Sequence, residues 1–243
     1  MGKSALFAVT MIVTITSFVF AQEMKPEDTE EWDFVPPKVT AGTHGKAPSD
    51  AISLGHSAWQ SEKEGGGENP WAKKDGVMTI KPGTGGIKTK QSFGNVQLHV
   101  EWRAPVSGDE LTGQNRGNSG VFLQQFYEVQ VLDSNTGVTY SNGQAGSIYK
   151  QYPPLVNATK PPMEWQTYDI IYSAPTFDLG GNVEKKASIT VLHNGIVIQN
   201  HSILKGPSEF IGHPKYKAHG NLPIHIQDHD HEVSFRNIWV REL

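Results

Sequence analysis

The 243-residue sequence contains no cysteine, which excludes disulfide bonds and every metal site or catalytic mechanism that depends on a thiolate. The sequence also lacks a large excess of either sign of charge, because it has 21 Lys and Arg residues and 25 Asp and Glu residues. The basic residues are scattered rather than clustered, so we expect no nucleic-acid partner. No stretch repeats apolar residues at helical spacing over about 11 residues, which argues against a helical fold.

Only one long apolar run occurs, at residues 5–20, close to the N-terminus. Lys3 precedes this run, and Val19 and Ala21 provide the small or permissive residues that a signal peptidase site requires. We therefore predict a signal peptide at residues 1–21, cleaved after Ala21, and a periplasmic or secreted protein. The run has about 16 residues, which is short for a membrane helix, so no stable membrane span is expected after cleavage.

The remaining chain divides by composition into a tether and one domain. Residues 22–47 are acidic and proline-containing, which indicates a tether. In residues 48–243, turn signals such as Asp75-Gly76 and Asn194-Gly195 separate short runs rich in β-formers. We predict one all-β domain over residues 48–243, a sandwich of two antiparallel sheets.

Three of the expected strands, at residues 96–103, 127–131 and 224–227, alternate in an unusual way. Apolar residues occupy one parity and His, Glu, Arg or Gln the other, so the two sets lie on opposite strand faces. An ordinary solvated sheet face would also alternate. Such faces usually carry Lys, Thr and Ser, however. The Gln and Arg residues on these strands carry planar amide and guanidinium groups, which match sugar hydroxyls. The pattern therefore favours a concave, sugar-binding face.

Candidate chemistry is carried by carboxylates and one aromatic residue. Glu101 and Glu128 lie mid-strand on polar faces, and two carboxylates in different environments can divide acid and base roles. The sequence does not say whether their strands are neighbours. The polar, glycine-bearing loop 107–114 can rim a pocket. Trp71, in the polar segment after Pro70, is a candidate platform for sugar stacking.

The densest histidine cluster is His225-Ile226-Gln227-Asp228-His229-Asp230-His231. It can be a metal site, or the end of a strand followed by a polar turn. No second His or Cys pair completes a transition-metal site, so we assign no metal ligand. A Ca²⁺ or other divalent ion held by loop oxygens remains open.

Seven sequence blocks, in their order, resemble one bacterial family. They are KPGTG at 81–85, QLHVEWR at 97–103, RGNSGVFL at 116–123, YEVQVLDS at 127–134, GSIY at 146–149, EWQTYD at 164–169 and FRNIWV at 235–240. The family is named 3-keto-disaccharide hydrolase, or 3-keto-glucoside 1,2-lyase and 3-keto-2-hydroxyglucal hydratase. The resemblance covers nearly all of residues 48–243 and implies a concanavalin A-like jelly roll. It also implies cleavage of 3-keto glycosides by C2-proton abstraction, elimination of the C1 group and hydration.

The resemblance suggests roles for residues on the polar strands and the adjoining loops. Expected proton-transfer groups are Glu101, Glu128 and His229. Expected substrate-binding residues are His99, Arg103, Asn118, Gln130, Tyr149, His225, Gln227, Arg236 and Trp71. This chain departs from the family pattern at Asp230, where glycine is usual, and Asp tolerates the positive φ of such a turn better than most residues.

The resemblance also bears on partners and leaves rival functions open. It implies a carbohydrate substrate, no redox cofactor, and a separate sugar 3-dehydrogenase upstream that makes the ketone. One rival is a non-catalytic carbohydrate-binding module, because the same fold often only binds sugars. A second rival is a conventional glycosidase that uses two carboxylates on an unoxidised sugar.

Overall fold

The computed structural model describes residues 24–43 and 45–243, and it divides at Lys38 into two units. The described part of the first unit is exposed and contains a short 3-10 helix, η1 (Pro26–Thr29). The predicted signal peptide, residues 1–21, lies outside the described residues. Within the described residues, no helix has the length and apolar character needed to cross a bilayer.

The second unit, Val39–Leu243, is nearly all-β, and its described residues contain no α-helix. Three 3-10 helices interrupt the loops: η2 (His56–Ala58), η3 (Gly113–Asn115) and η4 (Ser141–Gly143). The strands are β1 (Ile52–Ser53), β2 (Trp59–Ser61), β3 (Ala72–Lys74), β4 (Val77–Thr79), β5 (Ile87–Phe93), β6 (Val96–Arg103), β7 (Ser119–Leu123), β8 (Tyr127–Val131), β9 (Gln166–Ser173), β10 (Thr176–Phe177), β11 (Val183–Lys185), β12 (Ser188–His193), β13 (Ile196–Ile203), β14 (Leu222–Ile226) and β15 (Ser234–Glu242).

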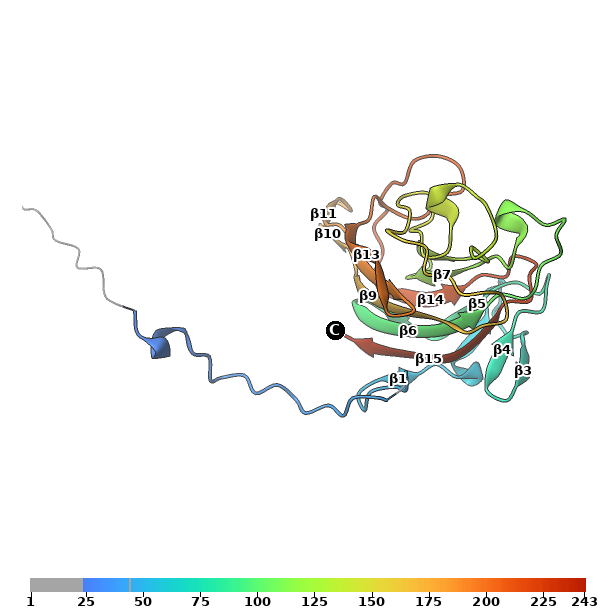
Figure 1. Cartoon of the computed structure of the whole chain (residues 1–243). Helices are drawn as coiled ribbons and strands as arrows, with labels where there is room; N and C mark the ends of the chain where they lie inside the picture. Colours follow the sequence, from blue (N-terminus) through green and yellow to red (C-terminus); the bar gives the residue numbers. More distant parts are fainter. Residues whose placement is uncertain (1–23, 44) are drawn as a thin grey trace, which may run out of the picture. The chain divides into compact units, whose positions relative to one another are not determined.

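These strands form two main antiparallel sheets, which confirms the predicted jelly-roll sandwich. The large sheet has the order β13-β12-β9-β6-β15-β4-β3, with β1 added on β15. The small sheet has the order β2-β5-β14-β7-β8, and β10 and β11 form a separate ribbon. Figure 1 shows β5, β14 and β7 as one layer and β9, β6 and β15 as the other, with long loops beyond β7 and β14.

The apolar parity of each strand faces the space between the sheets. Leu98, Val100 and Trp102 of β6 are buried in the same core as Val129 and Val131 of β8. Burying one such side chain contributes roughly 1.5–3 kcal/mol, so this face decides the register of both strands. The polar parity of β6 therefore lies on the outer face of the large sheet, and that of β8 on the outer face of the small sheet.

The compact unit begins earlier than the predicted domain, which starts at residue 48. The described residues 39–43 and 45–47, expected in the tether, belong to this unit. The Gly45 carbonyl accepts hydrogen bonds from Asn237 Nδ2 at 2.8 Å and from Trp239 Nε1 at 2.9 Å. These two bonds attach the end of the expected tether to β15.

Candidate functional site

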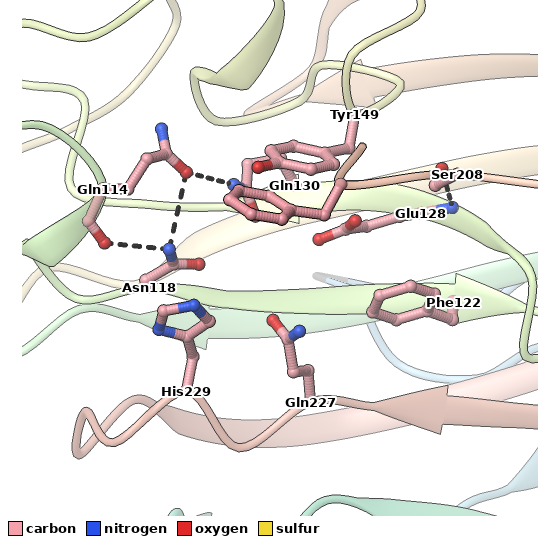
Figure 2. Close-up of a pocket in the computed structure, with 10 residues that line it drawn as sticks. Gln114, Asn118, Phe122, Glu128, Gln130, Tyr149, Ser208, Gln227 and His229 are labelled. Carbon is pink, nitrogen blue, oxygen red and sulfur yellow. Dashed lines mark hydrogen bonds between the residues drawn. The ribbon is translucent and has the colours of Figure 1, made fainter. Parts of the chain in front are cut away.

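A pocket of about 250 Å³ lies on the outer face of the small sheet. Strands β7 and β8 and the residue that follows β14, Gln227, supply its floor, and the loops supply its walls (Figure 2). Its lining residues are Gln114, Asn118, Phe122, Glu128, Gln130, Tyr149, Ser208, Phe210, Gln227 and His229. Six of these residues are among the predicted site residues: Asn118, Glu128, Gln130, Tyr149, Gln227 and His229.

Glu128 is the one carboxyl group among the lining residues, and Figure 2 shows it pointing into the pocket. The neighbouring strand leaves room for it, because a Cβ at Gly120 would fall 2.5 Å from Glu128 Oε1. Only 6% of Glu128 is exposed, and this burial raises the pKa of its carboxyl group to about 8. At neutral pH the group is therefore mostly protonated and can donate a proton.

Three amide side chains along one wall orient one another. Gln114 Oε1 accepts a hydrogen bond of 2.9 Å from Gln130 Nε2, and the Gln114 carbonyl accepts one of 2.8 Å from Asn118 Nδ2 (Figure 2). On the floor, the carbonyl of Gln227 accepts a bond of 2.7 Å from Ser119 Oγ, which holds the chain just after β14. The pocket thus offers positioned amide donors and acceptors, which suit sugar hydroxyls and a ketone oxygen.

Two aromatic residues from the loops complete the wall beside Glu128. The hydroxyl groups of Tyr149 and Tyr140 lie 2.7 Å apart, and burial raises the pKa of the Tyr149 hydroxyl, which stays protonated. Lys150 Nζ donates a bond of 2.6 Å to the Phe210 carbonyl and lies 4.3 Å from the centre of its ring. Phe210 is 70% exposed, so an aromatic surface is open to a sugar ring at the rim.

His229 reaches the pocket from the turn after β14. Asp230 in this turn has φ 60°, the left-handed conformation that the family's glycine would adopt. The turn is closed by Asp228, whose Oδ1 accepts from the Asp230 N–H at 3.0 Å and whose Oδ2 accepts from the Gly85 N–H at 2.9 Å. The substitution by Asp therefore keeps the turn and leaves His229 at the pocket wall.

The other histidines of this cluster point elsewhere. His225 Nε2 lies 2.6 Å from Glu62 Oε2, and His231 Nε2 donates to the Asn115 carbonyl at 3.0 Å. His225 shares the outer sheet face with the pocket, and its ring lies 5.0 Å from that of Phe122. Within residues 24–43 and 45–243, no three His, Asp or Glu side chains are grouped as metal ligands.

The predicted carboxylate pair is wrong, because Glu101 lies on the outer face of the other sheet. Its Oε2 accepts a bond of 2.5 Å from Arg236 Nε, and its Oε1 accepts one of 2.8 Å from Asn237 Nδ2. The register of β15 shifts between Arg236 and Trp239, and Asn237 in this stretch has φ 46°. Glu101 is thus a partner in a structural network and does not reach the pocket.

The other predicted residues of β6 and β15 belong to the same network on the large sheet. His99 Nδ1 lies 2.7 Å from Asp169 Oδ1, and the His99 ring stacks on Trp239. The guanidinium groups of Arg103 and Arg236 lie over the ring of Trp165, at 4.8 and 4.0 Å. The structure therefore places His99, Arg103 and Arg236, which were expected to bind substrate, on a different sheet from Glu128 and the pocket.

Trp71 is not a sugar platform, because only 3% of it is exposed. Its ring stacks on Phe235, and its Nε1 donates to the Gly85 carbonyl at 3.0 Å. The polar residues before it had suggested an open loop. The indole instead supports the segment of Gly85, which in turn holds the turn of His229 through Asp228.

Four lining residues were not named from the sequence. Gln114 ends the loop that was expected to rim a pocket, and Phe122 has the outward parity of β7. Local sequence features could therefore have indicated both as pocket residues. Ser208 and Phe210 lie in the loop between β13 and β14. No local pattern marks that loop, because long-range packing brings it over β8: Ser208 Oγ accepts from the Glu128 N–H at 3.1 Å.

Comparisons with known proteins agree with this architecture. Residues 51–241 match the model of a family described as the 3-keto-alpha-glucoside-1,2-lyase-like domain. A solved structure of a candidate glycosyl hydrolase from Parabacteroides distasonis ATCC 8503 is 48% identical, with a TM-score of 0.83 over 90% of this chain and 97% of that chain. A second candidate glycosyl hydrolase of that organism is 19% identical, with a TM-score of 0.56 over 85% of this chain and 100% of that chain, and supports the fold alone. No curated protein matches.

Proposed function

Because this chain belongs to the 3-keto-alpha-glucoside-1,2-lyase-like family, we propose that its pocket cleaves 3-keto glycosides. Membership in the family and 48% identity to a candidate glycosyl hydrolase indicate an enzyme that acts on glycosides. The proposal adds that the substrate is an oxidised, 3-keto sugar and that cleavage occurs by elimination followed by hydration. One observation carries it: the pocket holds a single carboxyl group, Glu128, and burial raises its pKa to about 8.

A single protonated carboxyl group fits elimination better than ordinary glycoside hydrolysis. Hydrolysis of an unoxidised sugar commonly uses two carboxyl groups that flank the bond. A ketone at C3 removes that need, because it acidifies the proton on C2. The site then requires one base near C2, donors to the C3 oxygen, and one acid near the leaving oxygen.

The lining residues can fill these three roles. The imidazole of His229, on the wall beyond the end of β14, takes the C2 proton, and the C2–H electrons form an enolate on the C3 oxygen. As the ketone re-forms, a C1–C2 double bond forms and the C1–O bond breaks. Glu128 gives its proton to the leaving oxygen. Water then adds at C1 and a proton returns to C2, which completes a net hydrolysis.

The amides stabilise the charge that develops on the C3 oxygen. Asn118 and Gln130 are held by Gln114 before any substrate arrives, so little reorganisation is needed. Tyr149 and Gln227 lie beside Glu128 and can position hydroxyl groups of the same sugar (Figure 2). A module that only binds sugars, the rival considered above, has no use for a buried carboxyl group that remains protonated at neutral pH.

Glu128→Gln tests the proposal directly, because the amide keeps the shape of the side chain but cannot donate a proton as an acid does. Release of the leaving group from a 3-keto glucoside should fall at least about a hundredfold. Glu101→Gln is the matched control on the other sheet and should keep turnover within about twofold. Wild-type turnover retained in Glu128→Gln would contradict the role given to this residue.

The proposed reaction also suggests a setting for the protein. We propose that it is exported, since residues 1–21 have the features of a signal peptide. Its carbohydrate substrate must already carry the ketone, so a separate sugar 3-dehydrogenase has to act first. The proton transfers described above are assigned to side chains and involve no redox cofactor.

A further inference from the structure

The polar face of the small sheet continues past the pocket. The strand register aligns one row of outward-facing residues across five strands: Glu128, Phe122, His225, Lys88 and Gln60. The first two line the pocket, and the other three lie beyond the ring of Phe122. Neighbouring strands are about 4.8 Å apart, so Lys88 lies roughly 14 Å from Glu128 across the sheet.

The next row contains two glycines, one on each side of β14. Gly120 of β7 leaves room for Glu128, as described above. Gly86, just before β5, does the same on the other side: a Cβ there would fall 2.5 Å from His225 Nε2 and 2.9 Å from Glu62 Oε2. Each glycine thus allows a carboxyl group to lie over the sheet, and the two carboxyl groups flank β14.

The two carboxyl groups have opposite protonation states at neutral pH. Contact with His225 holds the pKa of Glu62 below its ordinary value, against the effect of partial burial, and the Gly86 N–H and the Lys88 ammonium lower it further. The Gly86 N–H donates to Glu62 Oε1 at 2.5 Å. Glu62 is therefore ionised, whereas Glu128 is mostly protonated. The Glu62 side chain is 38% exposed, so a ligand can reach it from solvent.

We propose that Glu62, His225, Lys88 and Gln60 form a second sugar subsite, which binds the leaving-group sugar of a disaccharide substrate. We call these four residues the distal subsite. An ionised carboxylate accepts hydrogen bonds from sugar hydroxyls, and the ammonium and amide groups donate to their oxygens. The rings of Phe122 and His225, 5.0 Å apart, provide an apolar strip between the two subsites. This inference rests on the proposed function, in which Glu128 protonates the leaving oxygen.

The distal subsite predicts a dependence on the size of the leaving group. A hydroxylated sugar as leaving group contacts both subsites, whereas a methyl group ends near Phe122 and touches none of the four residues. Substitutions in the distal subsite should therefore lower kcat/KM for a 3-keto disaccharide and leave kcat/KM for a methyl 3-keto glucoside unchanged. Residues of the pocket, in contrast, should affect both substrates.

Kinetics with these two substrates test the proposal. Glu62→Gln keeps an acceptor for the Gly86 N–H, and Lys88→Ala removes the ammonium group of a half-buried lysine. In each variant kcat/KM for the 3-keto disaccharide should fall about tenfold, mainly through KM, with no change for the methyl glucoside. Lys90→Ala is the control, because Lys90 has the same parity on β5 but is exposed and lies outside the row. Equal losses on both substrates, or no loss in either variant, would overturn the distal subsite.

A binding measurement separates failure of this inference from failure of the proposed function. If the wild type cleaves neither keto substrate, calorimetric titration with an unoxidised disaccharide and with glucose still addresses the subsite. Tighter binding of the disaccharide that weakens in Glu62→Gln and Lys88→Ala, but not in Lys90→Ala, would support the distal subsite. Equal affinity of the wild type for both sugars, or identical affinities in all variants, would overturn it.

Discussion

At the scale of single residues, Glu128 and Glu101 show how one pattern leads to two outcomes. Both carboxylates occupy the polar parity of their strands, β6 and β8, as alternation predicted. Glu101 accepts hydrogen bonds from Arg236 and Asn237, whereas Glu128 is covered by loops and burial raises the pKa of its carboxyl group. Burial without a compensating charge disfavours the ionised form, so Glu128 can donate a proton at neutral pH.

The pH dependence of turnover follows from this difference. If Glu128 donates a proton to the leaving oxygen, it must be protonated, and the pKa of its carboxyl group is about 8. We expect kcat for a 3-keto glucoside to fall as the pH rises through about 8. A rate that instead rises through this pH would show that Glu128 acts as the base.

At the scale of the strands, the pocket depends on the contact between β7 and β8. Gly120 lies opposite Gln130 in the register of these strands, next to the pair Phe122 and Glu128. A Cβ at Gly120 would lie 2.5 Å from Glu128 Oε1 and 2.8 Å from the Phe122 ring. The missing side chain therefore sets the position of the acid.

Gly120→Ala tests this role of the strand pair. The added methyl group should displace the Glu128 carboxyl group and the Phe122 ring, and it should lower kcat by roughly tenfold to a hundredfold. Gly55→Ala is the control, because nothing lies within 4 Å of a Cβ at that position. A Gly120→Ala enzyme that is folded and as active as the wild type would contradict the assigned geometry.

At the scale of the whole molecule, the sandwich separates two polar faces by one apolar core. The face on the large sheet holds the Gly45 segment through Asn237 and Trp239, and the face on the small sheet carries the pocket. Stability and chemistry are therefore assigned to different sheets. The buried carboxyl group of Glu128 is the exception, because it links the chemistry to the stability of the fold.

This link predicts a pH dependence of unfolding. The ordinary pKa of the Glu128 carboxyl group is 4.5 and its value in the fold is about 8, so the folded protein holds a proton that the unfolded chain releases between these values. The contribution of Glu128 to stability is complete below pH 4.5 and decreases as the pH rises to about 8, by a few kcal/mol in order of magnitude.

Denaturant unfolding of the wild type and of Glu128→Gln at several pH values checks this expectation. The stability of the wild type relative to Glu128→Gln should decrease from about pH 4.5 to about pH 8 and then level off. Glu184→Gln makes the same chemical change at an exposed position of β11 and serves as the control. A difference between wild type and Glu128→Gln that does not vary with pH would contradict the burial of this carboxyl group.

Much of the fold was predictable because alternation and turns are local signals. The polar parities of β6, β8 and β14 were correct, as was the loop that ends at Gln114. Strand order is not local, so the sequence did not reveal that β6 and β8 lie in different sheets, and the pair of Glu101 and Glu128 was wrong. Trp71 was misjudged because polar neighbours do not report what packs against a side chain.

The most direct test of the central claim follows the C2 proton. The mature chain would be incubated in deuterated water with a 3-keto glucoside and, separately, with its unoxidised parent, and the products followed by NMR. We predict release of the leaving group from the keto sugar alone, with deuterium at C2 of the sugar product. Release from both sugars without deuterium at C2 would contradict the elimination route and indicate an ordinary glycosidase, and saturable binding without release would indicate a carbohydrate-binding module.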